Sequence, residues 1–397
     1  MPTSDIKFID QESIEDKRIL LRVDFDVSQK LDSSIADDYR ITQNLPTMKY
    51  LLSKHNRLIC VAKRGRPTGR DPKLSLKIVA ERLQTYLPDN PIIFIDDFQS
   101  PEGQEMLKNQ KTNEIILLEN IRYYPEEKRN DLELAKKLAS LADVYVNDAF
   151  AVCHRAHSSV VAVAELLPSY GGLLLKKEIE MIGNAIKNPQ KPVVTILGGA
   201  KISTKINLIN KLLEIADYLI IGGGLANTFL AAEGYEIGKS IYEYDEKENA
   251  RRLLFMATQK NTSIVLPSDV VVGKPDDKIV CGITKKIENV QRDDQILDIG
   301  PETQAKFGAI IAKAKTIIWN GPVGYFENAC YRNGTDFIYY SITHNDGAVS
   351  IVGGGDTLAA ISKKEYLDKI THISTGGGAM LEYIEKGTLP GIEALRK

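Results

Sequence analysis

The residues best suited to chemistry in this 397-residue chain are two lysines that follow a pair of glycines. In ILGGAKISTKI, residues 196–206, an apolar run ends at Gly198-Gly199, and Lys201 and Lys205 come next, four residues apart. Glycine lets the backbone approach a ligand closely, and the N-terminus of a following helix attracts anions. We expect both lysines on one face of that helix, where they would clamp a phosphate group. An isolated pair at this spacing would instead indicate a solvent-exposed lysine face.

Other glycine clusters in the second half follow short apolar runs in the same way, at Gly222–Gly224, Gly353–Gly355 and Gly376–Gly378. Several such turns predict that loops at the ends of strands converge on one polyanion. Asp356 directly follows one cluster and would repel a phosphate unless a cation intervened, so we expect Mg²⁺ there; a helix N-cap is a compatible role. Glu327, in WNGPVGYFE (319–327), is a candidate for ribose hydroxyls or, alternatively, a surface residue at a helix start.

Two common nucleotide motifs are absent from the sequence. The string GYEIGKS, residues 234–240, has one spacer residue too few for a P-loop, and no helix start is evident there. No GxGxxG fingerprint occurs either. A P-loop protein and a nicotinamide-dependent dehydrogenase are therefore poor interpretations.

The first half contains single arginines at or near the ends of predicted strands: Arg22, Arg40, Arg66, Arg122 and Arg155. Alone, each would be a surface ion pair of little consequence. Together, at one edge of a sheet, they predict a site for a small, multiply charged acid. The nearby HRAH string supplies His154 and His157, but no carboxylate or thiolate lies at a suitable spacing, so a metal site there is not favoured.

The bulk composition is that of a soluble globular protein without a dominant charge. The 51 Lys+Arg and 53 Asp+Glu residues give a net charge of −2, so we expect neither nucleic acid nor a membrane as a partner. The N-terminus is acidic and lacks an apolar core, which predicts a cytoplasmic protein without a signal peptide. The four cysteines show no CxxC spacing, and we expect them to be buried or incidental thiols in a reducing cytosol.

Apolar runs alternate with helical patterns along the whole chain. The runs expected to be strands cover residues 18–24, 57–63, 91–96, 114–120, 143–148, 192–198, 217–223, 263–269, 316–321, 348–354 and 371–375. Amphipathic helices are expected at Tyr39–Lys54, Leu76–Tyr86 and Leu132–Leu141. Continuous apolar strands separated by helices indicate parallel sheets buried on both faces, so the fold class is α/β with two doubly wound domains. The seam is expected at residues 166–172, before a helix that begins near Leu173.

A series of motifs in one order resembles the phosphoglycerate kinase family, of bacterial type, over essentially the whole chain. They include RVDF (22–25), DDYRI (37–41), GRP (65–67), LLENIRYYPEE (117–127), HRAHSS (154–159), ILGGAKISTKI, IGGGLANTFL (221–230), LPSDVVV (266–272), WNGPVGYFE, GGGDT (353–357) and STGGGAMLEYIEKGTLPGI (374–392). The resemblance implies two Rossmann-like domains joined by a hinge helix. Residues 1–168 with the tail 387–397 would bind 3-phosphoglycerate, and residues 169–386 would hold the hinge helix and bind the Mg-nucleotide.

The activity that this resemblance implies is reversible phosphoryl transfer from 1,3-bisphosphoglycerate to MgADP, without a prosthetic group, in a monomer. The acid-substrate positions that match are Asp24, Arg40, Arg66, Arg122 and Arg155. The nucleotide positions are Lys205, Asn320, Glu327, Gly353, Gly354, Gly355, Asp356 and Thr357, with Asp356 toward the metal. Arg40, Lys201 and the backbone N–H groups of Gly376–Gly378 would neutralise the transferred phosphoryl group, which is the main catalytic task in such a reaction.

Departures from the family pattern fall in the half that should hold the acid. The family usually has Asn and Pro where this chain has Asp26 and Ser28, Ser-His-Leu in place of Ala62-Lys63-Arg64, and Gly-Thr-Ala in place of Ala151-Val152-Cys153. We expect Lys63 to pair with Asp26 and restore the local charge, with both residues in the substrate site. Two alternatives remain open: a kinase for a different acid, and a nucleotide-binding relative without catalysis. The retained Lys201, Asp356 and STGGG turn argue against lost chemistry.

Overall fold

The computed structural model describes residues 6–30, 32–277, 280–361 and 364–396. The chain forms two compact units, Met1–Glu180 with Lys386–Lys397 (unit 1) and Met181–Glu385 (unit 2). The division falls within helix α6 (Leu173–Lys187), which begins where the sequence predicted a helix. In the described part of the chain, no helix combines the length and apolar character needed to cross a membrane.

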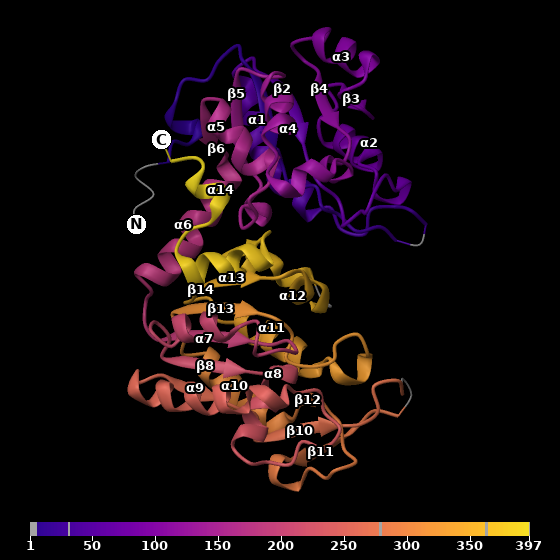
Figure 1. Ribbon diagram of the computed structural model, residues 1–397. Coiled ribbons are helices and arrows are strands. Elements are labelled where there is room, and N and C mark those ends of the chain that lie inside the picture. The colour runs from indigo at the N-terminus through magenta and orange to yellow at the C-terminus, as the bar shows by residue number, and fades with distance from the viewer. Residues whose placement is uncertain (1–5, 31, 278–279, 362–363, 397) are drawn as a thin grey trace. The chain divides into compact units, whose positions relative to one another are not determined.

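Unit 1 is built on a six-stranded parallel sheet in the order β3-β4-β2-β1-β5-β6 (Figure 1). Its strands are β1 (Arg18–Arg22), β2 (Arg57–Val61), β3 (Ile92–Ile95), β4 (Ile115–Leu118), β5 (Val144–Asn147) and β6 (Ser169–Gly171). Its α-helices are α1 (Tyr39–Ser53), α2 (Lys77–Tyr86), α3 (Pro101–Lys108), α4 (Leu132–Ala139), α5 (Val163–Leu166) and α14 (Pro390–Glu393). Short 3₁₀ turns cover Ile9–Gln11, Pro72–Leu74, Ile121–Tyr123, Pro125–Arg129 and Phe150–Val152, and Ser158–Ala162 is a π-turn.

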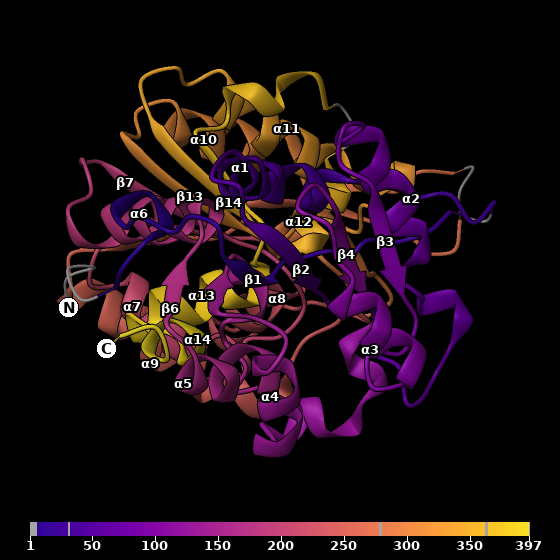
Figure 2. The same cartoon turned by 90° about the horizontal axis from the view of Figure 1, so that it is seen from above.

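Both faces of the unit 1 sheet are covered, as the continuous apolar strands predicted. Figure 2 shows α1 on one side of β1 and β2, and α4 and α5 on the other. Alternate residues of β1, such as Ile19 and Leu21, join one core with Met48 of α1 and Val79 of α2. Helix burial is what holds these strands in place, since parallel strands need cover on each side.

Unit 2 contains a second six-stranded parallel sheet, in the order β15-β14-β13-β7-β8-β9. Its strands are β7 (Val193–Leu197), β8 (Tyr218–Ile221), β9 (Ser263–Val265), β13 (Thr316–Asn320), β14 (Val349–Gly353) and β15 (His372–Ser374). Its α-helices are α7 (Ile206–Leu212), α8 (Gly223–Ala232), α9 (Lys247–Gln259), α10 (Pro301–Ile311), α11 (Asn333–Thr343), α12 (Gly355–Ala360) and α13 (Gly377–Lys386). Short 3₁₀ turns cover Tyr244–Glu246, Ile287–Asn289, Ala329–Tyr331 and Lys364–Lys369. The prediction of two doubly wound α/β domains is confirmed at the level of the two sheets.

A three-stranded antiparallel sheet in unit 2 was not predicted. It consists of β10 (Asp269–Val272), β11 (Ile283–Lys286) and β12 (Ile296–Ile299), in the order β11-β10-β12. The single strand expected at 263–269 is wrong, because β9 ends at Val265 and β10 belongs to the other sheet. Pro267 lacks the N–H that a continuing strand would donate. Asp269 also turns its carboxylate to the first turn of α10, where it accepts from Thr303 N at 2.7 Å.

The cysteine prediction is wrong for one pair. Cys281 and Cys330 form a disulfide with an S–S distance of 2.11 Å, while Cys60 and Cys153 are free and buried. The pair is 49 residues apart in sequence and meets because the segment just before β11 lies beside the Ala329–Tyr331 turn. No spacing rule reveals a pairing that depends on an unpredicted sheet.

Near the middle of each six-stranded sheet is a point where the connections of two neighbouring strands run in opposite directions. In unit 1 this point lies between β1 and β5, and in unit 2 between β7 and β13. Connections leave opposite faces there, which opens a crevice at the carboxyl ends of the strands, where doubly wound folds bind ligands. The predicted site residues of each half follow these strand ends.

Candidate active site

In unit 2, the side chain of Lys205 bridges the two strands at the reversal point. Its Nζ donates to Gly198 O at 2.6 Å, after β7, and lies 3.4 Å from Asn320 Oδ1 at the end of β13. The Lys205 ammonium group therefore lies in the crevice where the fold class binds its ligand.

The two lysines do not share a helix face, so that prediction is wrong. Helix α7 begins only at Ile206, and Lys205 is its N-cap with a non-helical backbone. Residues before it form a turn held by Ser203, whose N and Oγ donate to Glu243 at 2.9 and 2.6 Å. Serine and threonine favour such local bonding over helix. Lys201 is exposed in this turn and has no ion-pair partner among the described residues.

The carboxyl ends of β13 and β14 are joined by two polar side chains. Asn320 pairs with Gly353 in the strand register and donates through Nδ2 to Gly353 O at 2.7 Å. Buried Thr357 donates its hydroxyl proton to Gly353 O at 2.8 Å and accepts from Gly321 N at 2.8 Å. Three predicted nucleotide residues thus stabilise one another's positions, and the hydroxyl group of Thr357 donates its hydrogen bond to the protein backbone.

Close backbone approach explains two of the glycines beside this network. Gly354 has φ +112°, and a Cβ there would lie 2.7 Å from Asn320 Nδ2. A Cβ on Gly377 would lie 2.4 Å from Gly354 Cα, so the GGGDT and STGGG turns are in contact. A Cβ on Gly355 or on Gly378 would meet nothing within 4 Å. Gly355 and Gly378, in the first turns of α12 and α13, therefore have open space where a side chain would begin, and helix N-termini attract phosphate groups.

The carboxylate of Asp356 lies outside the described part of the structure; only its backbone is placed, in α12. In the described part of the chain, no group of three or more His, Cys, Asp or Glu side chains comes together as a metal site. Mg²⁺ in kinases is bound by one or two carboxylates together with substrate phosphates. Open helix N-termini beside a single acidic residue fit an ion that arrives on a nucleotide.

A cavity of about 580 Å³ opens within unit 2 beside the start of α8 at Gly223 and Gly224. It is lined by Gly199, Ala200, Gly223, Gly224, Ala226, Asn227, Ile241, Pro267, Val270, Pro275, Asp276, Gln295, Ile296, Leu297, Asp298, Ile299, Pro322, Val323, Gly324, Tyr325, Phe326 and Glu327. Its volume lies in the range of small-molecule and cofactor sites, and apolar and glycine residues predominate. Of the predicted nucleotide residues, only Glu327 lines the cavity.

In unit 1, four predicted acid-site residues are in contact. Arg40, in the first turn of α1, lies 3.1 Å from Asp24 Oδ2 and 3.6 Å from Asp26 Oδ2. The predicted pairing of Lys63 with Asp26 is confirmed: their charged groups form an ion pair. The other Asp26 oxygen accepts from Gly65 N at 2.7 Å. The carboxylate that departs from the family pattern is therefore met by two cations and an N–H group.

The remaining predicted residues add positive charge at the same strand ends. Arg122, after β4, donates to Gly65 O at 2.7 Å, and Arg66 and Arg155 are exposed. Burial lowers the pKa of Arg122, and the charges of Arg22, Arg66 and Arg155 lower it further. Burial likewise lowers the pKa of Lys63 to about 8, against the opposing effect of Asp24. Burial and mutual repulsion of this kind are typical of cations gathered to face a polyanion.

A buried network behind these cations was missed by sequence reasoning. Arg22, at the end of β1, is buried and donates through Nε to Ser159 Oγ at 2.9 Å. Ser159 in turn donates to buried Glu127 at 2.6 Å, and His157 Nδ1 lies 3.7 Å from the same carboxylate. Of the five arginines, Arg22 thus has a supporting position. The nearest signal in the sequence was that Glu127 and Ser159 both lie in quoted motifs.

One α/β unit has a cluster of cations at its strand ends. The other has glycine-rich helix N-termini and a cavity. These features define a protein of the doubly wound class that binds phosphate-bearing small molecules. The family model described as phosphoglycerate kinase matches residues 9–387. The phosphoglycerate kinase of Dictyoglomus turgidum is 49% identical over 97% of both chains, and that of Clostridium novyi is 43% identical over 98% of both chains. The chain belongs to the phosphoglycerate kinase family, whose members are phosphotransferases of glycolysis.

Solved structures agree with this assignment. The structure of phosphoglycerate kinase from Coxiella burnetii matches with a TM-score of 0.86 at 38% identity, covering 98% of both chains. The crystal structure of the enzyme from Pyrococcus horikoshii matches with a TM-score of 0.85 at 31% identity, also covering 98% of both chains. The similarity therefore extends over both units.

Proposed function

We propose that this chain transfers a phosphoryl group reversibly between 1,3-bisphosphoglycerate and MgADP, giving 3-phosphoglycerate and MgATP. The observation that carries the proposal is the pair of reversal points: one has cations for an acid, and the other has Lys205 and open glycine turns for phosphates. Membership of the phosphoglycerate kinase family supports the identity of the two ligands.

The acid binds at the strand ends of unit 1. Arg66, Arg122 and Arg155 hold its phosphate, because exposed or half-buried guanidinium groups offer paired donors to such oxygens. Asp24 is buried and holds Arg40 at 3.1 Å, which orients that guanidinium toward the carboxyl end of the acid. Asp26 and Lys63 complete the charge balance of the site.

The nucleotide binds at the strand ends of unit 2. Its base and ribose occupy the 580 Å³ cavity, with Glu327 accepting hydrogen bonds from the ribose hydroxyls. Its phosphates reach Lys205 and the first turn of α12 at Gly354 and Gly355. Asp356 would hold the Mg²⁺ that arrives on the phosphates, and the ion would supply positive charge to the phosphate oxygens. Asn320, Gly353 and Thr357 act by fixing the geometry of the turn.

Transfer needs no covalent intermediate on the protein, because an acyl phosphate is already activated. Catalysis then consists of in-line positioning and neutralisation of charge on the moving group. Arg40, Lys201 and the N–H groups of Gly376–Gly378 provide that neutralisation. Lys201 is suited to follow the group because it is exposed in a turn and, within the described residues, has no ion-pair partner.

The two ligands bind to different units, so transfer requires a closing motion that also excludes water. We assign residues 1–168 and 387–397 to the acid-binding domain and residues 169–386 to the hinge and the nucleotide domain. Helix α6 crosses the division between the units and is the candidate hinge. The enzyme acts as a cytoplasmic monomer on small molecules, without nucleic acid, membrane or prosthetic group.

A kinase for a different acid is not favoured, because the substitution that motivated it is compensated. Asp26 would repel an acid substrate if its charge were unmatched. Instead it contacts Lys63 and accepts from Gly65 N at 2.7 Å. The acid site therefore keeps its positive character.

The test is a coupled assay of purified protein with MgATP, in which formation of the acyl phosphate is followed while the acid is varied. We expect saturable turnover with submillimolar 3-phosphoglycerate and none with 2-phosphoglycerate, which places its phosphate one carbon away. Absence of turnover with 3-phosphoglycerate, in protein that binds MgATP, would refute the proposed substrate. Equal turnover with both acids would refute the proposed phosphate clamp.

A further inference from the structure

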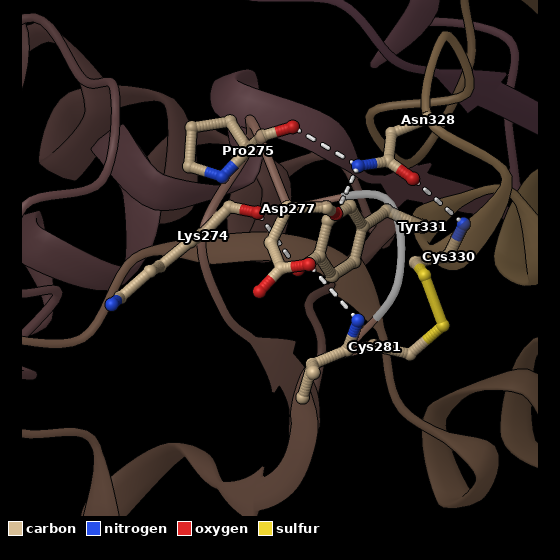
Figure 3. The surroundings of a disulfide bond; sticks show 8 residues. Lys274, Pro275, Asp277, Cys281, Asn328, Cys330 and Tyr331 are labelled. Atoms are coloured by element: carbon tan, nitrogen blue, oxygen red, sulfur yellow. Dashed lines mark hydrogen bonds between the residues drawn. A yellow bond between two sulfur atoms is a disulfide. The ribbon is translucent and has the colours of Figure 1, made fainter.

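The Cys281–Cys330 disulfide lies between two segments that line the cavity of unit 2. Upstream of Cys281, Pro275 and Asp276 form part of one wall, and just before Cys330, Phe326 and Glu327 form part of another. Figure 3 shows the disulfide with the side chains around it. Whether the disulfide is formed or reduced therefore affects the position of residues that line the cavity.

Hydrogen bonds join the same two segments beside the disulfide (Figure 3). Buried Asn328, next to Glu327, donates through Nδ2 to Pro275 O at 3.0 Å and to Asp277 O at 2.8 Å. Buried Tyr331, next to Cys330, donates to Lys274 O at 3.0 Å. The covalent bond and the hydrogen bonds thus join the segment from Lys274 to Cys281 to the segment from Asn328 to Tyr331.

The disulfide is accessible to a reductant, whereas the other two cysteines are too buried to exchange with it. Cys281 is exposed and Cys330 is half-buried. Cys60 and Cys153 are fully buried, and burial raises the pKa of each thiol to about 12, so neither supplies a thiolate near neutral pH. Disulfides in reducing compartments are usually transient or redox-sensing, which fits an accessible pair beside a ligand cavity.

We propose that Cys281 and Cys330 are redox-dependent positioning residues for nucleotide binding. The disulfide and the hydrogen bonds of Asn328 and Tyr331 together hold the Pro275–Asp276 wall against Phe326–Glu327, and reduction by a dithiol leaves only the hydrogen bonds, so that the walls become less ordered. The reduction is balanced: the S–S bond breaks, each cysteine gains a proton, and the dithiol loses two electrons and two protons as it forms its own disulfide. This inference rests on the proposed function, because it takes the cavity as the nucleotide site.

The expected effect falls on affinity and not on the transfer step. A wall that is already ordered loses less conformational freedom on binding, which corresponds to about a three- to tenfold difference in nucleotide affinity. The acid site and Lys201 are elsewhere, so kcat at saturating substrates should change little. By reciprocity, bound nucleotide must favour the disulfide by the same factor. A tenfold coupling shifts the midpoint potential of the pair by about 30 mV toward more negative values.

The experiment compares the full-length protein in its oxidised and dithiothreitol-reduced forms. Calorimetric titration with MgADP gives the affinity, and steady-state assays give KM for MgATP and kcat separately. The matched control is the Cys281→Ser/Cys330→Ser variant, which cannot respond to reductant. The midpoint potential of the pair is then measured with and without MgADP.

We expect the oxidised protein to bind MgADP about three- to tenfold more tightly than the reduced protein, with the serine variant resembling the reduced form in both conditions. Equal affinity in the two forms would overturn the inference, as would an effect of reductant that persists in the serine variant. Loss of MgADP binding in both forms would overturn the proposed function and this inference together. Redox-dependent MgADP binding without turnover of 3-phosphoglycerate would leave the inference standing and refute only the proposed acid.

Discussion

The substitution Asp26→Asn tests how the acid site tolerates a carboxylate and a lysine in place of the family's usual residues. Lys63 is only 9% exposed, and burial, with a smaller effect of the nearby arginines, lowers its pKa to about 8. The contact with Asp26 offsets this repulsion. Removing the Asp26 charge leaves Lys63 as a buried cation without its nearest counterion, so unit 1 should lose stability.

The magnitude follows from how far the pair is removed from water. The side chains of Lys63 and Asp26 are 11% and 25% exposed, which places the pair between a buried and a surface ion pair. Breaking a fully buried pair costs about 3–5 kcal/mol, and an exposed pair contributes about 0.2–1 kcal/mol. We therefore expect Asp26→Asn to lower the free energy of unfolding by about 2 kcal/mol at pH 7.

Lys63→Met should cost less, because Asp26 keeps Arg40 at 3.6 Å and the Gly65 N–H at 2.7 Å. In the double variant the Asp26→Asn change should then be nearly neutral, which gives a coupling free energy of about 2 kcal/mol. Hydrogen exchange of the buried β1 and β2 amides reports the opening of unit 1 in all four proteins. An exposed pair, Lys54 and Glu15 at 3.0 Å, serves as the control cycle, with an expected coupling below about 0.5 kcal/mol.

Additivity would refute this reasoning. If Asp26→Asn destabilised unit 1 equally with and without Lys63, within about 0.5 kcal/mol, the two charges would not depend on each other. The acid site would then contain an unmatched carboxylate, and the argument against a different acid substrate would lose its basis.

Three further outcomes are expected. Burial lowers the pKa of Lys63 to about 8, so KM for 3-phosphoglycerate should rise as the pH increases through that value and the cation is lost. The Lys63→Arg variant should show no such dependence of KM on pH. The same rise in that variant would contradict the role of Lys63 in binding the acid. Lys201→Ala should lower kcat by about 10²–10³-fold with little change in the KM of either substrate. The control Lys211→Ala, which removes a surface ion pair on α7, should leave kcat and both KM values unchanged. A rise in the nucleotide KM of Lys201→Ala that matched the loss of kcat would assign Lys201 to binding instead. Gly377→Ala, whose Cβ would lie 2.4 Å from a backbone carbon, should lower the melting temperature by roughly 5–10 °C. Gly378→Ala, whose Cβ would meet open space, should keep the melting temperature and lose activity. A stable Gly377→Ala variant with a destabilised Gly378→Ala variant would contradict the described geometry of this turn.

The parts of the fold that could be predicted from the sequence are those fixed by local pattern. Runs such as VVTIL and YLII are continuous and apolar, and they form strands buried in the sheet. The glycine clusters lie at strand ends, and helices α8, α12 and α13 begin within them, at Gly223, Gly355 and Gly377. The pairing of Asp26 with Lys63 could be predicted because both follow neighbouring parallel strands, which end at one edge.

The missed parts depend on contacts between distant segments. Strand β11 is short and mostly exposed, so ITKK carries no apolar signal, and the antiparallel sheet was invisible. The Cys281–Cys330 disulfide depends on that sheet. The turn at Ser203 replaces the expected helix because Glu243, 40 residues away, accepts its hydrogen bonds. In the sequence, Arg22 is one more arginine at a strand end, because its hydrogen-bond partner Ser159 lies 137 residues later in the chain.

The most direct test of the proposed transfer runs in the ATP-forming direction. Purified protein is mixed with 1,3-bisphosphoglycerate and MgADP, and ATP is measured by luminescence while inorganic phosphate is measured in parallel. We expect one ATP for each acyl phosphate consumed and no protein-dependent rise in inorganic phosphate, because the group passes directly between ligands in a site closed to water. Consumption of the acyl phosphate with release of inorganic phosphate and no ATP would contradict direct transfer.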